Sequence, residues 1–204
     1  VKDVSGNFGV QGTIPMKNNS NVVVGGVVQL KSKVNADATQ TIITTDTTIL
    51  NFDNNFDLPL YFGLGFAYTF LDRWLVGIDY KKEMWSDARF FGDRSFYDRS
   101  KISAGGQFLP DVSGRRYFNR VAYRLGANFS KSYYKVNGER VGSFSLTAGM
   151  GFPLKKGLNP TVINLAFEYG HNGKDASNMI REQFFKFTLN ATINERWFVK
   201  RKLN

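Results

Sequence analysis

Histidine and cysteine, the residues on which most metal and nucleophile chemistry depends, are almost absent from this 204-residue chain. There is no cysteine, so neither a thiol nucleophile nor a cysteine-based metal site can form. His171 is the only histidine, which rules out a multi-histidine metal site within the chain. No Walker loop, Rossmann fingerprint or zinc spacing occurs either. We therefore predict no metal site and no cofactor.

One arrangement leaves hydrolysis open as an alternative. His171 lies near Asn172 and Asp175, and Ser177 follows in the same segment. Together these residues would supply the base, the orienting group and the nucleophile of a lipid hydrolase. However, a histidine beside an Asn-Gly pair is more often part of a turn. We expect no catalytic residue and no enzymatic activity.

The remaining polar chemistry lies in charged side chains that alternate with apolar ones. The candidates for lining a polar interior are, in chain order, Asp79, Lys81, Glu83, Arg120, Arg124, Glu168 and Lys186. With a loop tip near residues 176–178, Glu168 and Lys186 come opposite each other, and such a cross-strand pair contributes about 0.2–1 kcal/mol. Two interpretations stay open: a lining that admits polar solutes or holds a plug, and charge pairing that fills a narrow interior.

These side chains are positioned by segments in which apolar and polar residues alternate. In the last segment Phe185, Phe187 and Leu189 share one face, whereas Lys186 and Thr188 share the other. A period of two residues indicates β-strands, and the 19 Phe, 9 Tyr and 20 Gly fit a strand-rich protein. Six segments show the pattern most clearly: 62–70, 74–83, 120–130, 143–152, 163–169 and 183–193.

Nine strands follow from this pattern and from the turn residues between its segments. They are 7–16, 21–36, 44–70, 74–90, 97–109, 116–135, 139–153, 160–171 and 182–194, with a candidate break near Asp57–Pro59. The links alternate in length. Residues 71–73, 110–115 and 154–159 form short turns, and the links 84–99 and 170–182 are longer. Residues 133–142 form a hairpin of intermediate length with its tip at Asn137–Gly138. Barrels of the bacterial outer membrane have short periplasmic turns and longer outer loops, so we assign the short links to the periplasmic side.

The two faces of the predicted strands differ in a way that favours a membrane. One face carries large apolar and aromatic side chains, and the other carries Gly, Ser, Thr and Asn with occasional charges. This distribution is typical of a transmembrane barrel with a polar interior, whereas a soluble barrel or sandwich, the alternative, has a densely charged outer face. No run of 18 apolar residues occurs, so no transmembrane helix is expected. We predict an all-β fold, an antiparallel transmembrane β-barrel of the outer membrane, forming a single domain over residues 1–204.

The net charge of +10 raises the question of nucleic-acid binding. Lysine and arginine are not gathered in one stripe but lie in the predicted links, as in Arg115–Arg116, Lys155–Lys156 and Lys200–Arg201–Lys202. Basic residues at the ends of an apolar band suit anionic lipid head groups, although solvated loop charges are the simpler alternative. We expect outer-membrane lipid and lipopolysaccharide as partners, and no nucleic acid.

A repeated turn suggests membrane-interface anchors. Arg73 and Trp74 leave one strand through an acidic–Arg–Trp turn, and Arg196 and Trp197 do the same after the last strand. Tryptophan settles at the head-group level, and a neighbouring arginine reaches lipid phosphate. The alternative is a generic turn capped by an aromatic residue.

Short motifs over roughly residues 58–204 resemble the long-chain fatty acid transporter (FadL/TodX-type) outer-membrane family, in its branch common in Bacteroidota. They include Leu58–Pro59 followed by Gly63–Leu64–Gly65–Phe66–Ala67–Tyr68, and Asp79–Tyr80 followed by Trp85–Ser86–Asp87. The closing stretch Asn194–Glu195–Arg196–Trp197–Phe198–Val199 is similar as well.

The resemblance implies a fourteen-stranded barrel with an N-terminal plug that passes hydrophobic molecules sideways through an opening in its wall. A chain of 204 residues is too short for that barrel, so we expect it to hold the C-terminal part, without the plug and the first strands. No gating residue is carried over. The expected function is passive transport or binding of hydrophobic compounds across the outer membrane. The alternative is a non-catalytic barrel subunit, with other outer-membrane proteins as partners.

Overall fold

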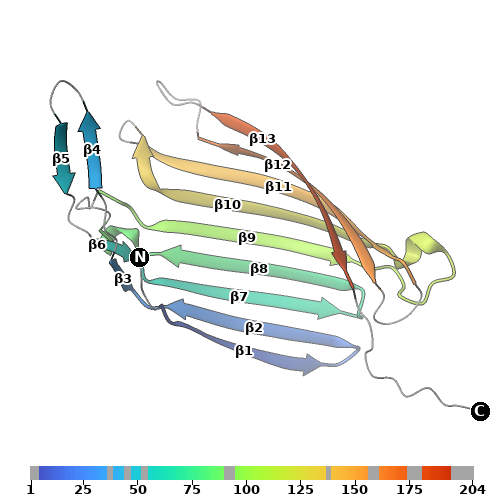
Figure 1. Ribbon diagram of the computed structural model, residues 1–204. Coiled ribbons are helices and arrows are strands. Elements are labelled where there is room, and N and C mark those ends of the chain that lie inside the picture. The colour runs from blue at the N-terminus through green and yellow to red at the C-terminus, as the bar shows by residue number, and fades with distance from the viewer. Residues whose placement is uncertain are drawn as a thin grey trace, which may run out of the picture.

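Nine long strands form one antiparallel sheet in the computed structural model of the chain (Figure 1). The structure describes residues 5–35, 39–43, 47–51, 55–89, 95–136, 139–155, 161–173 and 181–193. The strands, in their order across the sheet, are β1 (Asn7–Met16), β2 (Ser20–Gln29), β7 (Tyr61–Phe70), β8 (Trp74–Glu83), β9 (Arg99–Phe108), β10 (Ala122–Val136), β11 (Glu139–Pro153), β12 (Val162–Asn172) and β13 (Glu182–Thr192).

Two small hairpins and two short helices complete the described elements. Between β2 and β7, β3 (Ser32–Asn35) pairs with β6 (Asn55–Leu58), and β4 (Thr39–Ile43) pairs with β5 (Thr47–Asn51). Both hairpins extend beyond one end of the large sheet (Figure 1). The 3₁₀ helix η1 (Trp85–Asp87) follows β8 at that same end, and η2 (Tyr117–Arg120) precedes β10 at the other.

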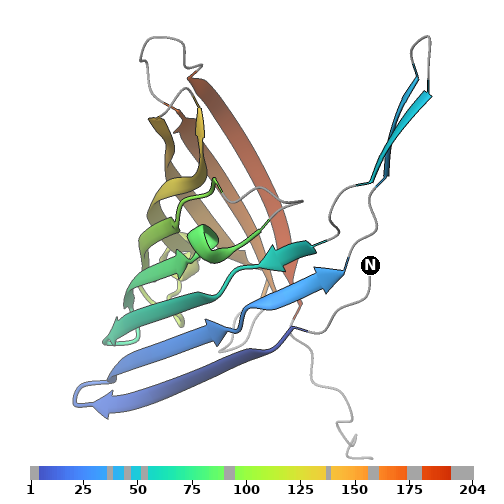
Figure 2. The ribbon, with the colours of Figure 1, turned by 90° about the vertical axis from the view of Figure 1, so that its left-hand side faces the viewer.

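The large sheet curves into a trough, seen nearly end-on in Figure 2. β1 and β13 form its two edges, and Figure 1 looks onto the concave face. Because successive side chains of a strand point to opposite faces, the register assigns every strand residue to one face. Leu125 pairs with Gly106 and Ala148 on the convex face, and Gly126 pairs with Gly105 on the concave face.

The sheet has almost no apolar core of the kind that stabilises a water-soluble protein. Among the described residues, the buried apolar side chains are Val34, Ala88, Val121 and Ala122. A soluble domain stabilises itself by removing apolar surface from water, at about 25 cal/mol per Å². Here the aromatic and aliphatic side chains of the strands remain exposed instead, so the structure requires an apolar surrounding.

The two ends of the sheet differ in the length of their links. At one end, here called the turn end, residues 17–19 and 71–73 connect neighbouring strands. Leu71 and Asp72 adopt left-handed backbone angles with φ of 52° and 55°. The two turns are joined, since the Asn19 side-chain amide donates a hydrogen bond of 2.7 Å to the Asp72 carboxylate. The opposite end, called the loop end, carries η1, β3 and β6.

Most sequence predictions for the fold are confirmed. All nine predicted strands contribute a strand to the large sheet. However, the second, predicted over 21–36, ends in the large sheet at Gln29 and continues as β3 in a separate sheet. The long third segment also supplies β5 and β6 to the small sheets and is interrupted next to Pro59, between β6 and β7. The links predicted to be short, 71–73, 110–115 and 154–159, all follow strands that run toward the turn end, although residues 156–159 lie outside the described part. The links 84–99 and 170–182 follow strands that run toward the loop end. The predicted link 133–142 is wrong in length, since β10 continues to Val136 and β11 begins at Glu139, and the predicted tip at residues 137–138 lies outside the described part.

Two predicted strands were also wrong because they include residues that form 3₁₀ helices, and one observed strand was missed. Residues 117–120, predicted as strand, form η2, so β10 starts at Ala122 and Arg120 lies outside it. Residues 85–87, also predicted as strand, form η1. Aromatic residues in both segments resemble strand residues by composition, but their backbones close short turns. The strand β4 was not predicted, because its polar sequence TQTII shows no clear alternation.

The left-handed backbone at Leu71 yields a stability prediction. For a residue with a Cβ this conformation costs roughly 1–2 kcal/mol, and less for asparagine. We expect Leu71→Asn to raise the unfolding free energy by roughly 0.5–1 kcal/mol in urea titrations in lipid vesicles. The control is Leu154→Asn, another exposed leucine at the turn end but without positive φ. Equal effects of the two substitutions would contradict the backbone explanation.

Candidate functional site

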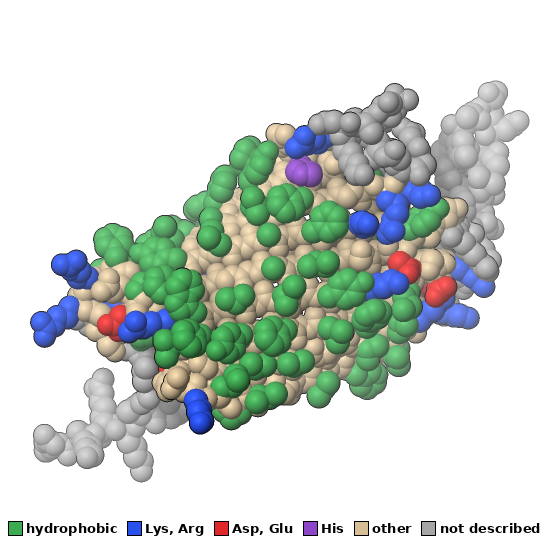
Figure 3. All heavy atoms as spheres, turned by 180° about the vertical axis from the view of Figure 1, so that it is seen from behind, with side chains coloured by type: hydrophobic (Ala, Val, Ile, Leu, Met, Phe, Trp, Pro, Cys, Tyr) green, Lys and Arg blue, Asp and Glu red, His purple; other side chains and the backbone are tan. Residues whose placement is uncertain are grey.

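The convex face is a continuous apolar surface. Its side chains come from alternate positions of all nine strands, and many are highly exposed: Leu125 is 72% exposed, Phe185 70% and Phe187 69%. Figure 3 shows these hydrophobic side chains spread over the middle of the face, with lysine, arginine and acidic side chains gathered toward its two ends. A middle band of apolar groups between charged rims matches the profile of a lipid bilayer.

Aromatic side chains on this face pack against neighbours on adjacent strands. Trp74 stacks on Phe108 with ring centroids 4.2 Å apart, and Tyr169 lies 4.9 Å from Phe185. Such cross-strand aromatic pairs are worth about 0.5–1.5 kcal/mol beyond their area. They also hold the rings against the sheet, which keeps the convex surface smooth. Among the described residues, no helix is both long enough and apolar enough to cross a bilayer.

The concave face carries a ladder of polar side chains that satisfy one another. The Arg124 guanidinium donates from Nε to Gln107 Oε1 at 2.7 Å and from Nη1 to Asn164 Oδ1 at 2.6 Å. Asn164 in turn donates to Thr192 Oγ1 at 3.3 Å. This chain of contacts links β9, β10, β12 and β13 across the face, and it ties the strands together on the side away from the apolar surface.

A second set of polar contacts lies nearer the loop end. The hydroxyls of Ser130 and Ser143 are 2.7 Å apart, and the Asn128 amide donates to Ser145 Oγ at 3.4 Å. Both pairs join register partners of β10 and β11. Because the polar groups are directly paired, the inner surface of these strands is stiffened by its own side chains and needs no bound ligand to satisfy them.

The predicted interior charges of β8 all lie on the concave face. Lys81 Nζ lies 3.0 Å from Glu83 Oε1, and Arg99 of β9 approaches the same carboxylate oxygen at 3.7 Å. Asp79 lies over Gly65, where an added Cβ would come 2.5 Å from the Asp79 carboxylate oxygen. Glycine at position 65 therefore makes room for an inward-pointing carboxylate.

The other predicted interior residues are distributed along the same face. Glu168 of β12 and Lys186 of β13 are register partners, as the sequence predicted, but in the described part of the chain no ion pair joins their side chains. Arg124 belongs to the polar ladder. Arg120 lies in η2, and its guanidinium carbon is 5.2 Å from the centre of the Tyr117 ring.

A hollow of about 550 Å³ lies over the first four strands of the sheet. On the concave face Gln11, Val23, Val27, Ala67, Asp79 and Lys81 border it, and glycines form much of its floor. The glycines on this face are Gly9, Gly25, Gly63, Gly65 and Gly77. Because these positions carry no side chain, they leave open space above the sheet. Val23, Val27 and Ala67 give this space an apolar surface, in contrast to the polar ladder over β9 to β13.

The predicted interface anchors are described only in part. Trp74 begins β8 at the turn end on the convex face and is 48% exposed, and Arg73 directly precedes it in the turn. This is the position that an interfacial tryptophan would take. Arg196 and Trp197, the second predicted pair, lie outside the described residues.

His171 lies near the loop end of β12, in contact with the Phe144 ring at 5.9 Å between centroids. Register and alternation place it on the convex face, and its Nδ1 is buried without a hydrogen-bond partner among the described residues. Asp175 and Ser177, the other members of the hypothetical hydrolase, lie outside the described part. Within the described residues, no three His, Cys, Asp or Glu gather into a metal-binding group.

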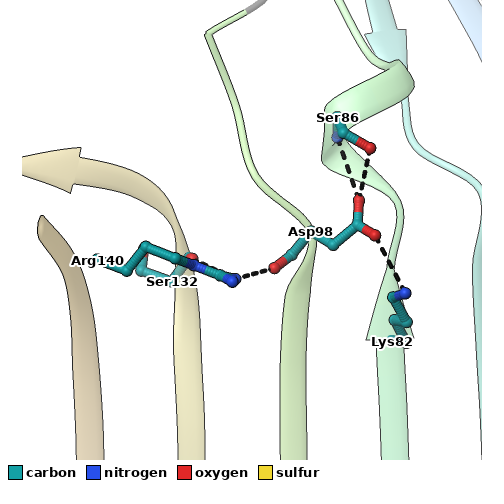
Figure 4. A network of polar contacts seen from close by, with 5 residues as sticks. All are labelled: Lys82, Ser86, Asp98, Ser132 and Arg140. Atoms are coloured by element: carbon teal, nitrogen blue, oxygen red, sulfur yellow. Dashed lines mark hydrogen bonds and ion pairs between the residues drawn. The ribbon is translucent and has the colours of Figure 1, made fainter. Parts of the chain in front are cut away.

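At the loop end, sequence reasoning missed a polar network that joins three strands (Figure 4). The Asp98 carboxylate accepts hydrogen bonds from the Ser86 hydroxyl at 2.7 Å and its backbone N–H at 3.3 Å, and it pairs with Lys82 Nζ at 3.1 Å. Arg140 of β11 donates to the Asp98 carbonyl and, at 3.3 Å, to the Ser132 carbonyl. Ser86 and Asp98 beside strand ends were the available sequence signal, since such residues fix turns.

Aromatic side chains surround this network. Trp85 stacks on Tyr133 with ring centroids 4.6 Å apart, and Phe96 lies 6.0 Å from Tyr133. Lys135 Nζ lies 4.1 Å from the centre of the Tyr97 ring. Together with the Asp98 network, these contacts fix the link between β8 and β9 against β10 and β11, so the loop end presents an ordered platform of aromatic and charged groups.

Fold and faces together define a wall of an antiparallel β-barrel, apolar on its convex side and polar on its concave side. The chain belongs to the BamG family, whose model matches residues 1–204. A search of curated proteins found no match.

Among solved structures, the chain is similar to the toluene transporter TodX of Pseudomonas putida, with a TM-score of 0.51 and 19% sequence identity. The similarity covers 92% of this chain and 47% of TodX, so the chain spans about half the length of that protein. At this identity the likeness concerns the fold. The resemblance to the FadL/TodX type seen in the sequence is thus confirmed for the architecture.

Neighbouring residues on opposite faces of β11 provide a test of this orientation. Leu146 lies on the convex face, whereas Thr147 lies on the concave face opposite Glu168. We expect Leu146→Arg to destabilise the protein folded in lipid vesicles by roughly 2–4 kcal/mol, the cost of a cation at the bilayer midplane. Thr147→Arg gains a carboxylate partner and serves as the matched control, with a small effect. Urea titration measures both, and the reverse order would show that the faces are exchanged.

The Asp98 network predicts a loss of stability in acid. Burial raises the pKa of Asp98, but the hydrogen bonds from Ser86 and the ion pair with Lys82 outweigh it, so this pKa lies below the ordinary 3.8. A lowered pKa stabilises the folded state above the ordinary value, and the contribution disappears as the pH falls through the lowered pKa. We expect Asp98→Asn to cost roughly 0.2–1 kcal/mol at pH 7 and less at pH 3, where part of the contribution of the carboxylate is lost.

Unfolding titrations at the two pH values measure this difference. Asp87→Asn is the control, since the Asp87 carboxylate is nearby but forms no ion pair within the described residues. A cost of Asp98→Asn that stays the same at both pH values would mean that the carboxylate charge does not matter.

Proposed function

We propose that this chain forms a membrane-spanning wall of a non-catalytic β-barrel in the outer membrane of a Gram-negative bacterium. The observation that carries the proposal is the reversal of the usual distribution: the exposed convex face is apolar, and the concave face is polar. Transfer of the convex face from water to hydrocarbon is favourable at about 25 cal/mol per Å². Among the described residues, no side chains cover the convex face in place of hydrocarbon. Outer-membrane lipid and lipopolysaccharide would then be its immediate surroundings.

Within that role, we infer that the barrel binds hydrophobic compounds or passes them passively across the membrane. The support is the hollow bordered by Val23 and Val27, which offers an apolar surface on the otherwise polar concave face. TodX, which has the same fold, is a toluene transporter, and this agrees with such a use of the wall. The mechanism needs no reacting group: an apolar solute exchanges water for the hollow and then leaves it for the bilayer.

A second function, a structural subunit of a larger outer-membrane complex, is favoured by a different observation. The polar ladder over β9 to β13 is held together by its own hydrogen bonds and offers a hydrophobic solute less apolar surface than the hollow does. The loop end adds an ordered aromatic and charged platform, the type of surface at which protein partners dock. In this case the wall would serve as a rigid scaffold.

Filling the hollow discriminates between the two functions. In full-length protein reconstituted in lipid vesicles, we expect Val23→Trp to weaken binding of the apolar fluorophore N-phenyl-1-naphthylamine about fivefold, because a bulky ring occupies the space. Val22→Trp, one residue along on the convex face, is the control and should not change binding. Equal binding by both variants would count against the transport proposal. Recovery of a larger complex by mass measurement after gentle detergent extraction, together with unchanged binding, would support the subunit.

A further inference from the structure

A second, smaller pocket lies on the concave face at the turn end. Its volume is about 180 Å³, and its charged lining residues are Arg120, Arg124 and Lys155. Leu109 and Val112 of the link before β10 border it as well. This link is well anchored, because Val121 at its end is fully buried. The pocket therefore lies between β10, the link that contains η2 and the end of β11. The hollow proposed to bind hydrophobic compounds lies elsewhere, over β1, β2, β7 and β8.

Arg124 is held in a fixed position within this pocket. Its hydrogen bonds to Gln107 and Asn164 use two of its five N–H groups, which leaves three for another acceptor. Gly151 lies directly beside the guanidinium, since a Cβ there would come 3.2 Å from Arg124 Nη2. The glycine lets the guanidinium approach the backbone of β11, so the arginine is preorganised before any ligand arrives.

Arg120 contributes an observation that points to a missing acceptor. Its Nε is buried and has no hydrogen-bond partner among the described residues. A buried donor without an acceptor destabilises the folded state, so such donors are rare unless a ligand or water accepts the hydrogen bond. The guanidinium is positioned by the Tyr117 ring, 5.2 Å away. Arg120 thus adds a residue with a buried, unpaired donor to the lining of the pocket.

The charge of the pocket is uncompensated. Lys155, in the link after β11, adds a third positive group, and the lining contains no carboxylate within the described part of the chain. Three cations balance a doubly charged phosphate better than a singly charged carboxylate, and the arginine fork matches phosphate geometry. The volume of about 180 Å³ is large enough for a phosphate group.

We propose that this pocket binds one phosphate group. The pocket opens on the concave side, away from the apolar face that lipid would cover, so the phosphate comes from a soluble anion or phosphate ester and not from a lipid head group. This site is separate from the hollow over β1, β2, β7 and β8, and it does not depend on the function proposed above.

The test is calorimetric titration of inorganic phosphate into full-length protein in detergent micelles. We expect one site in the unmodified protein, an affinity lowered about tenfold in Arg120→Gln, and a smaller loss of about threefold in Lys155→Gln. Arg116→Gln is the matched control, because Arg116 lies exposed in the same link but does not line the pocket. Lys155 is exposed, so its variant remains informative even when Arg120→Gln fails to fold.

Two results would overturn the proposal: no phosphate binding by the unmodified protein, or equal weakening by Arg116→Gln, which would indicate unspecific attraction to a basic surface. The source of the phosphate is tested in nanodiscs. If the natural ligand is a soluble phosphate, we expect the same affinity for phosphate in phosphatidylcholine discs as in discs containing phosphatidylglycerol. Loss of soluble-phosphate binding in the anionic discs would show that a lipid head group occupies the pocket and would refute the assignment to a soluble anion.

Discussion

Hydrogen bonding of the backbone is the constraint on which the whole molecule depends. In hydrocarbon an unpaired N–H or C=O group costs several kcal/mol, so a strand can exist there only between two partners. The nine-stranded sheet supplies such partners for every strand from β2 to β12, with one register shift between Lys131 and Lys135 of β10 where it pairs with β11. Once the ladder is fixed, the pleat sends alternate side chains to opposite faces, and the apolar and polar surfaces follow from it.

The two faces of the sheet are stabilised by different types of contact. On the convex side the chain has no buried core to form, and its aromatic pairs, such as Trp74 with Phe108, organise a surface that lipid completes. On the concave side Arg124, Gln107 and Asn164 replace hydrophobic packing with directed hydrogen bonds. At the loop end Asp98 links β8 to β9, and Arg140 extends this link to β11. Aromatic pairs thus stabilise the convex side, hydrogen bonds stabilise the concave side, and the Asp98 network stabilises the loop end.

The sequence predicted the sheet well because apolar and polar residues alternate in almost every strand. Glu168 and Lys186 could be placed opposite each other from the loop tip alone, and the register confirms it. The boundaries failed where local turns imitate strands: Tyr117 and Phe118 have strand-like side chains but begin η2. The hollow and the Asp98 network escaped prediction for another reason. The Asp98 network depends on which strands are neighbours. The hollow depends in addition on the space that glycines such as Gly65 leave. The order of residues in the sequence shows neither the neighbouring strands nor this space.

The order of the strands also bears on how the sheet assembles. Every pair in the large sheet except one joins strands that follow each other directly in the chain. The exception is the pair of β2 and β7, because β3 to β6 lie between them in the sequence. Local pairings form quickly, whereas a distant one must first close a loop, at an entropic cost that grows only with the logarithm of loop length. We therefore expect the β2–β7 pair to form more slowly than the other pairs, and changes in the length of the segment between these strands to cost little free energy.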